Sequence, residues 1–204
     1  MKKPILFLAA AVLAAGAVPA FAQEMDEAAM MKAWTEFMTP GAPHAELAGW
    51  AGEWNVTMKM WQDPSAPAME TTGKVTKSMI LGGRYLSEEV EANVMGMPMK
   101  GMGLTGYNNQ TKEYESIWID TMGTGMLYTT GTKEGDKITL HGEYPDPMTG
   151  GMAKVKMTMK IQDADHYVFE YWQEQKGEMM KGMEGHYSRA GSKDMGKGED
   201  EGGW

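Results

Sequence analysis

The chain has 204 residues, a formal net charge of −9, 23 methionines and no cysteine. Its acidic balance disfavours nucleic acid and anionic lipid surfaces as partners, because phosphate groups repel a negatively charged protein. The lack of thiols rules out disulfides, cysteine nucleophiles, iron–sulfur clusters and cysteine-based zinc sites.

The first 22 residues have the pattern of a secretory signal peptide. Lys2 and Lys3 give a positive start, an apolar run covers 5–18, and Ala20-Phe21-Ala22 has the small-x-small pattern of a cleavage site. The apolar run is shorter than the ~20 residues that a membrane-spanning helix needs. We therefore expect an exported protein, periplasmic or secreted, that begins at Gln23 and has no membrane span after cleavage. Loss of the two lysines would change the net charge from −9 to −11.

Residues 23–43 are expected to form an N-terminal helix and a linker. The segment 24–38 carries acidic residues in its first turn and apolar residues at helical spacing, namely Met30, Met31, Trp34, Phe37 and Met38. Pro40 and Pro43 end this helix, and the segment 44–50 is typical of one or two further helical turns.

After this helical segment the chain changes to short alternating segments separated by turn residues. The expected strands are 53–62, 70–80, 84–94, 101–107, 113–121, 125–133, 136–144, 151–161, 165–175 and 180–189. About ten strands joined by short links, with no helix between them, predict an all-β, antiparallel up-and-down barrel, because closure removes exposed sheet edges. Residues 191–204 are glycine-rich and charged, and we expect a disordered acidic tail there.

Alternation along the strands separates an inward face from an outward face. Met58 and Met60 alternate with Thr57 and Lys59, for example. Apolar inward faces predict a lumen that holds one small apolar molecule. The expected lining residues are Met58, Met60, Trp118, Asp120, Leu140, Met157, Met159, Phe169 and Tyr171.

Two short motifs resemble those of the calycin superfamily, which includes the lipocalins. Gly52-Glu53-Trp54 opens the first expected strand, and Tyr187-Ser188-Arg189 ends the last one. The resemblance implies that Trp54 closes the floor of the barrel and that Arg189 lies over its ring in a cation–π contact.

A longer set of segments resembles the bacterial domain of unknown function 1579 family. These segments are 44–54, Leu81-Gly82-Gly83-Arg84-Tyr85-Leu86, Gly106-Tyr107-Asn108, Trp118-Ile119-Asp120 and Tyr187-Ser188-Arg189. The resemblance covers residues 44–190 and implies a calycin-like β-barrel domain there. The family has no settled activity, so the resemblance implies a fold without a function, and the sequence specifies neither a cofactor nor an oligomeric state.

A soft-metal site is one alternative function. Four methionines lie near the link between the third and fourth expected strands, namely Met95, Met97, Met99 and Met102. Thioethers are ligands that suit Cu(I) or Ag(I). The same methionines are also ordinary apolar residues, and the sequence leaves both interpretations open.

Haem binding and catalysis are further alternatives. Some calycin relatives hold haem through one late histidine, and His186 is the candidate by position. The carboxylates Glu88, Asp120, Glu143 and Glu170 lie on expected strands, and those facing the lumen would suit acid–base chemistry. Standard catalytic motifs are absent from the sequence, so no catalytic residue is assigned and binding without turnover is the favoured interpretation.

Overall fold

The computed structural model describes residues 26–63 and 65–192. The expected signal peptide and residues 193–204 of the expected tail lie outside the described residues. Two helices come first, α1 (Glu27–Met38) and α2 (Ala42–Gly49). The Asp26 side chain caps α1 by accepting a hydrogen bond from the backbone N–H of Ala28 (3.0 Å). Within the described part of the chain, neither helix has the length and hydropathy needed to cross a bilayer.

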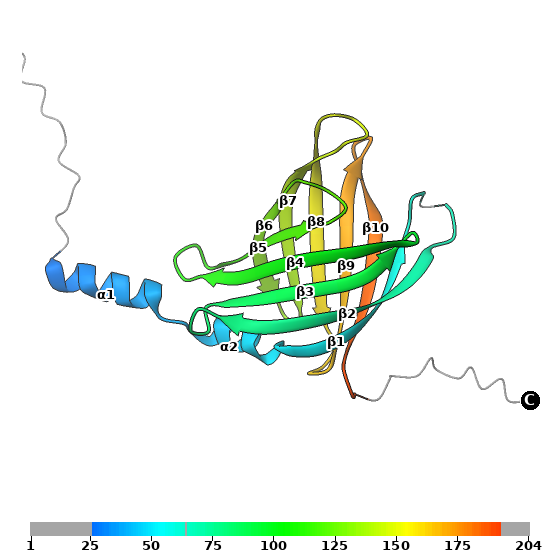
Figure 1. Ribbon diagram of the computed structural model, residues 1–204. Helices are drawn as coiled ribbons and strands as arrows, with labels where there is room; N and C mark the ends of the chain where they lie inside the picture. The colour runs from blue at the N-terminus through cyan, green and yellow to red at the C-terminus, as the bar shows by residue number, and fades with distance from the viewer. Residues whose placement is uncertain (1–25, 64, 193–204) are drawn as a thin grey trace, which may run out of the picture.

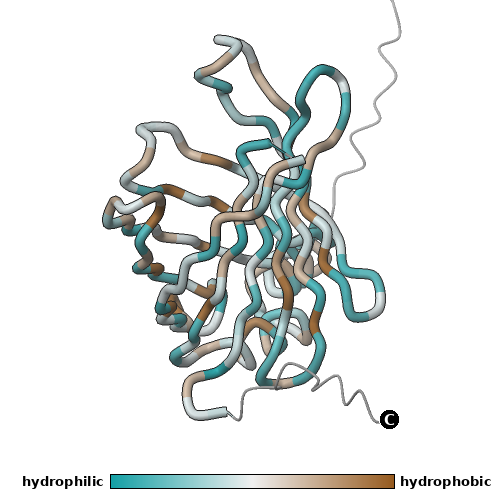
Figure 2. Tube along the Cα trace, turned by 90° about the vertical axis from the view of Figure 1, so that its right-hand side faces the viewer, coloured by the Kyte–Doolittle hydropathy of each residue, from teal (hydrophilic) through white to brown (hydrophobic). Residues whose placement is uncertain are grey.

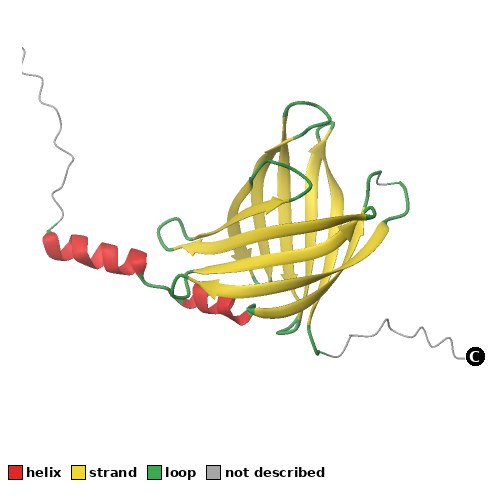
Figure 3. Cartoon of the chain, in the orientation of Figure 1, coloured by secondary structure: helices red, strands yellow, loops and turns green. Residues whose placement is uncertain are grey.

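Ten strands follow the helices. They are β1 (Gly52–Met60), β2 (Met69–Ile80), β3 (Tyr85–Val94), β4 (Met97–Asn108), β5 (Glu113–Asp120), β6 (Leu127–Glu134), β7 (Lys137–Pro145), β8 (Met152–Ile161), β9 (His166–Gln175) and β10 (Glu178–Arg189). Each strand pairs antiparallel with the next, and β1 pairs with β10, so the sheet closes into a barrel (Figures 1 and 3). The predicted ten-stranded up-and-down barrel is confirmed.

One end of the barrel is covered by α2, and we call this end the floor (Figure 1). Leu47 and Trp50 from this segment are buried, and they belong to one apolar cluster with Leu86 and Tyr114. The opposite end, which includes the turn between β3 and β4, is called the mouth. Among the described residues, α2 therefore covers the floor and no helix covers the mouth.

Hydrophobic and hydrophilic residues alternate along the strands, as the colours of the trace in Figure 2 show. The inward residues form two buried clusters, one around Leu140 and Met157 and the other around Val56 and Val75. Partly buried residues that pack against both clusters are Trp118 and Phe169. Burial of these apolar faces is the main stabilising term of the fold.

The start of β4 differs from the sequence-based prediction. The strand begins at Met97, not at residue 101, because β3 and β4 are joined by a tight turn at Met95 and Gly96. Both turn residues have positive φ, 54° and 82°, which is the backbone of a type I′ hairpin and twists as the strands do. The segment 95–100, expected to be a link, is therefore mostly strand.

Candidate functional site in the barrel interior

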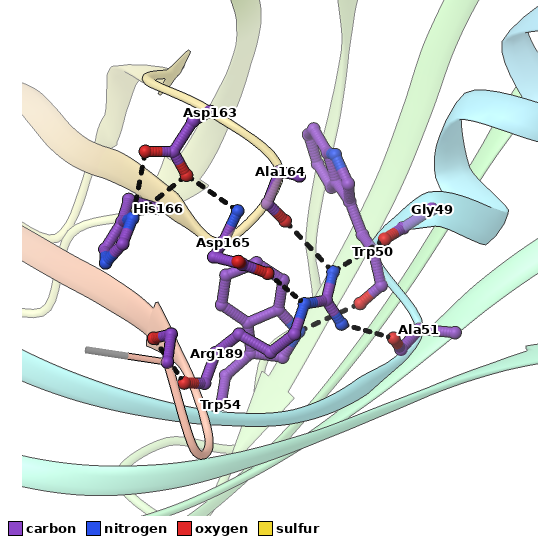
Figure 4. A network of polar contacts seen from close by, with 10 residues as sticks. Gly49, Trp50, Ala51, Trp54, Asp163, Ala164, Asp165, His166 and Arg189 are labelled. Atoms are coloured by element: carbon purple, nitrogen blue, oxygen red, sulfur yellow. Dashed lines mark hydrogen bonds and ion pairs between the residues drawn. The ribbon is translucent and has the colours of Figure 1, made fainter. Parts of the chain in front are cut away.

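The floor of the barrel is held together by Arg189. Its guanidinium lies 4.5 Å from the centre of the Trp54 ring, as the calycin resemblance implies (Figure 4). Two of its N–H groups donate to the backbone oxygens of Gly49 (2.8 Å) and Ala51 (2.9 Å), and Nε donates to Asp165 Oδ1 (2.8 Å). Arg189 thus ties the end of α2 to β1 and to the β8–β9 turn. This set of bonds uses the planar fork of arginine, which lysine lacks.

A buried ion pair lies inside the barrel near the floor. Lys77 Nζ is 2.6 Å from Glu88 Oε2 and donates a hydrogen bond to the Tyr167 hydroxyl (2.8 Å). The Lys77 side chain is 4% exposed. Burial raises the pKa of Tyr167, with the nearby Tyr187 and the Glu88 carboxylate adding to the effect. The Tyr167 phenol therefore stays protonated and accepts from lysine.

Aromatic rings surround this ion pair. The rings of Trp50 and Tyr167 are stacked with centroids 5.6 Å apart, and those of Tyr167 and Tyr187 are stacked at 4.3 Å. Lys77 Nζ lies 4.9 Å from the centroid of Tyr167, within the range of a cation–π contact. The rings therefore stabilise the ammonium group where water is excluded.

Lys77 was missed by the sequence analysis, although the sequence contains the signal. Val75, Lys77 and Met79 alternate with Thr76 and Ser78, so the lysine shares the inward face of its strand. A lysine in a period-two apolar face marks a buried charge that needs a partner. Glu88 is the residue directly opposite Lys77 in the β2–β3 pairing.

The nine expected lining residues all point inward, but they fall into two groups. Met58, Leu140 and Met157 are buried in the packed clusters. Six are only partly buried although they face the lumen, namely Met60, Trp118, Asp120, Met159, Phe169 and Tyr171. Since these six side chains point inward, their exposure means that solvent reaches the lumen beside them.

Trp118 lies flat against the wall of the barrel. Two inward-facing glycines on β4, Gly101 and Gly103, provide the space, and a Cβ at Gly101 would meet the indole ring at 2.3 Å. Trp118 Nε1 donates to Asp120 Oδ2 (2.7 Å), and Asp120 Oδ1 accepts from the backbone N–H of Met122 (2.8 Å). Asp120 thus orients the indole, and both of its oxygens already accept hydrogen bonds. This arrangement gives no support to Asp120 as a catalytic acid or base.

The two sides of the lumen differ in chemistry. Inward positions on β7–β9 are mostly apolar, such as Leu140, Met159 and Phe169, although Gln173 is polar. Inward positions on β2–β6 include the polar residues Lys77, Glu88, Thr105, Ser116 and Thr129. Thr105 donates to Ser116 (3.2 Å), while the buried Thr129 hydroxyl has no hydrogen-bond partner among the described residues. The lumen therefore has a mostly apolar side on β7–β9 and a side with polar residues on β2–β6.

The haem hypothesis through His186 is wrong in its geometry. His186 is opposite Thr57 and Val168, which point away from the lumen, and its side chain is exposed and bonded to Glu184 on the outer wall (2.8 Å). One residue in a strand changes the face, so Tyr187 points inward instead. Of the four carboxylates considered, Glu88 and Asp120 face the lumen, whereas Glu143 and Glu170 alternate with inward residues and lie outside.

The four methionines of the soft-metal hypothesis do not share a face. Met97 and Met99 point inward, Met95 lies in the turn, and Met102 points outward and is exposed. Met102 lies three positions after Met99, an odd offset, which places the two side chains on opposite sides of β4. The strand geometry therefore does not bring together the predicted set of thioether ligands.

Two hollows lie outside the lumen proper. One of about 410 Å³ opens beside α2, between the Glu46–Lys133 ion pair and the rings of Trp50 and Trp54. Another of about 670 Å³ lies on the wall formed by β1–β4. The first shows that α2 covers the floor without filling it.

Solved structures share this fold. Rv2717c from M. tuberculosis is similar with a TM-score of 0.52 and 16% sequence identity, over 74% of this chain and 99% of that chain. The S-type phycobiliprotein lyase CPES from Guillardia theta is similar with a TM-score of 0.53 and 11% identity, over 78% of this chain and 98% of that chain. At such identities the likeness concerns the fold alone.

Curated proteins give no match to the chain. The model of the family described as "Protein of unknown function (DUF1579)" matches residues 39–189. This range contains α2 and all ten strands. The chain therefore belongs to that family, in agreement with the resemblance of its sequence motifs.

Proposed function

We propose that this protein is exported and binds a small, largely apolar molecule in the lumen of its barrel. The observation that carries the proposal is the partial exposure of inward-facing side chains, among them Trp118, Met159 and Phe169. Large apolar side chains that face inward and still meet solvent are typical of ligand sites. The barrel fold that the chain shares with a phycobiliprotein lyase is compatible with this function.

The residues on the two sides of the lumen indicate what kind of ligand would fit. An apolar body would pack against β7–β9, where Met159 and Phe169 are directly paired. A hydrogen-bonding edge would face β4–β6, where the Thr129 hydroxyl is buried without a partner among the described residues. Satisfying such a group on binding is favourable, because an unpaired buried polar group costs roughly 1–3 kcal/mol. We therefore infer an amphipathic molecule rather than a pure hydrocarbon.

The test uses anilinonaphthalene sulfonate, a fluorescent probe with an apolar body and a polar group. Met159→Trp adds ring volume beside Phe169 and is expected to weaken probe binding roughly tenfold or more, since an occupied space cannot take the probe. Met148→Trp is the matched control, because Met148 is 90% exposed in the β7–β8 loop. If Met159→Trp and Met148→Trp both keep the fold and bind the probe equally well, the lumen is not the binding site.

Export has a separate test. The protein recovered from the exported fraction of its native cells should begin at Gln23 when its N-terminus is sequenced, because Ala20-Phe21-Ala22 precedes that residue. Recovery only from the cytoplasm, with Met1 intact, would overturn the proposed location and leave the binding test unaffected.

A further inference from the structure

The helix α1 carries an apolar stripe that is exposed along its whole length. Five large apolar residues lie within about a third of the helix circumference, as expected for 3.6 residues per turn. Each is 45–61% exposed: Met30, Met31, Trp34, Phe37 and Met38. None of the residues of α1 is buried against the part of the chain that the structure describes. A stripe of this size on a soluble helix marks an interaction surface.

The direction of α1 is set by side chains of the barrel. Asn109, in the β4–β5 turn, donates to the backbone oxygens of Glu36 (3.0 Å), Phe37 (3.1 Å) and Thr39 (2.8 Å). Arg84, in the β2–β3 turn, donates to the backbone oxygen of Met38 (2.7 Å). These bonds satisfy carbonyl groups at the end of the helix, where partners within the helix are missing. As a result α1 projects away from the barrel, and we call this helix the arm (Figure 1).

A second apolar surface lies on the outer wall of β4–β6. Its members are neighbours in the strand pairing: Met102 is opposite Ile119, Leu104 is opposite Ile117, and Ile117 is opposite Tyr128. Four of the five are 38–51% exposed, with Leu104 half-buried between them. We call these five residues the outer apolar wall.

This wall differs from the rest of the barrel exterior. On β8, the outward positions are all polar, namely Lys154, Lys156, Thr158 and Lys160. Lys154 and Lys160 are exposed, while Thr158 is buried and donates to Glu170 (3.1 Å). The outer apolar wall lies on β4–β6, and β4 and β5 are joined by the turn that holds α1 through Asn109. The wall begins four residues along these strands from that turn and extends toward the mouth. The arm therefore starts at the floor end of the strands that carry the wall.

We propose that two copies of this chain form a dimer by exchanging arms, with α1 of each copy packed on the outer apolar wall of the other. The ten side chains of one arm and one wall expose on the order of 100 Å² each. Two reciprocal contacts would then bury up to roughly 2,000 Å² in total, within the standard range of specific interfaces. Reciprocal contacts also close the assembly at two copies.

A membrane surface fits α1 less well than a second copy. Helices that lie on membranes carry many Lys or Arg residues on their polar face. In α1 and its cap the only basic residue is Lys32, which pairs with Glu36 (3.8 Å), and Asp26 and Glu27 add further negative charge. The whole chain has a net charge of −9, which anionic lipids repel.

The first experiment measures the dimer dissociation constant of the protein lacking residues 1–22 by sedimentation velocity. Trp34→Glu on the arm and Ile117→Glu on the wall should each raise it about 100-fold or more, because each places a charge in the apolar contact. Met148→Glu adds the same charge at an exposed loop and should leave it unchanged. A monomer at all concentrations up to about 100 µM, or a dimer insensitive to both variants, would overturn the proposal.

A second experiment distinguishes exchange from other contacts. The chain has no cysteine, so Trp34→Cys and Ile117→Cys each introduce one thiol. Mixing the two variants, one with a mass tag, should give a disulfide between unlike chains, whereas a chain carrying both changes should not link to itself when dilute. Linkage within the doubly substituted chain would show that α1 folds back on its own wall. Flotation of a monomeric protein with phosphatidylcholine vesicles, lost in Trp34→Glu, would assign α1 to a membrane instead.

Discussion

At the scale of single residues, the buried pair of Lys77 and Glu88 is the most demanding feature of the interior. Lys77 leaves water almost completely and the Glu88 side chain stays 24% exposed, and their attraction offsets the cost of this burial only when the geometry is good. Here the lysine has the carboxylate at 2.6 Å, the Tyr167 hydroxyl at 2.8 Å and a face of aromatic rings. The two residues stabilise the fold only as a pair, so loss of one lowers the free energy of unfolding more than loss of both.

Glu88→Gln should therefore lower the free energy of unfolding by about 3–5 kcal/mol, because it leaves the Lys77 ammonium buried without a counter-charge. The double variant Lys77→Met with Glu88→Leu should lose less than Glu88→Gln alone. Urea denaturation followed by circular dichroism measures both values. A single variant that is no less stable than the double variant would show that the pair does not act as a unit.

Sequence reasoning at this scale succeeded where a residue belongs to a pattern. Trp54 and Arg189 were placed together by the calycin resemblance, and the inward direction of Met58 and Leu140 followed from alternation. It failed for contacts across the lumen, such as Lys77 with Tyr167, which are 90 residues apart in sequence. Alternation gives the face of a residue, but strand register and shear decide which residues meet.

At the scale of elements, α2 depends on a buried histidine for its start. His44 Nδ1 accepts a hydrogen bond from the backbone N–H of Gly41 (3.0 Å), which requires that nitrogen to be unprotonated. Burial lowers the pKa of His44 from its usual 6.5, although a hydrogen bond with the backbone of Tyr107 opposes this, and Arg84 lowers it further. The folded state therefore favours the neutral form of His44.

The stability of the protein should consequently fall in acid through His44. The pKa of His44 in the unfolded chain is 6.5, its usual value. Well above this pH the histidine is neutral in both the folded and the unfolded state, and its full contribution to the stability of the fold is present. As the pH drops below 6.5 the unfolded chain takes up the proton first, and the loss is complete below the lowered folded pKa. Urea midpoints measured from pH 8 to pH 5 should fall less steeply in His44→Asn than in the parent protein. Identical slopes would mean that His44 is not the group responsible.

The elements themselves were largely readable from the sequence. Period-two alternation and turn residues placed all ten strands, with the main error at the start of β4. That error arose because Gly96 was taken as part of a long link, whereas Met95 and Gly96 make a two-residue turn with positive φ. The register of pairing, and hence the outward position of Met102, could not be read before that turn was known.

At the scale of the whole molecule, the lumen is packed in some places and accessible in others. Met58 is 4% exposed within a packed cluster, while Met60, two residues nearer the mouth, is partly buried. Sequence analysis assigns both methionines to the lining of the lumen, because their spacing and chemistry are the same. Only the three-dimensional packing separates a core residue from a lining residue.

Substituting tryptophan at these two positions should separate the roles. Met58→Trp overfills a packed cluster and is expected to cost about 1–3 kcal/mol of stability. Met60→Trp enlarges a side chain in accessible space and should leave stability nearly unchanged while weakening the binding of anilinonaphthalene sulfonate. Thermal unfolding and probe titration of both variants provide the comparison. Equal destabilisation by the two changes would mean that the lumen near Met60 is also filled.

The closure of the barrel by β1 and β10 has a consequence for how the chain folds. Nine of the ten strand pairings join strands that follow one another in sequence, and the tenth joins Trp54 to Arg189. Hairpins between successive strands lose little loop entropy on forming, whereas this last pairing must bring together distant parts of the chain. The pairing of β10 with β1 should thus limit the folding rate. Joining the end of β10 to the start of α2 through a short linker, with new ends opened in the β7–β8 loop at Met148, would keep α2 on the floor and shorten the connection between β10 and β1 to this linker and α2.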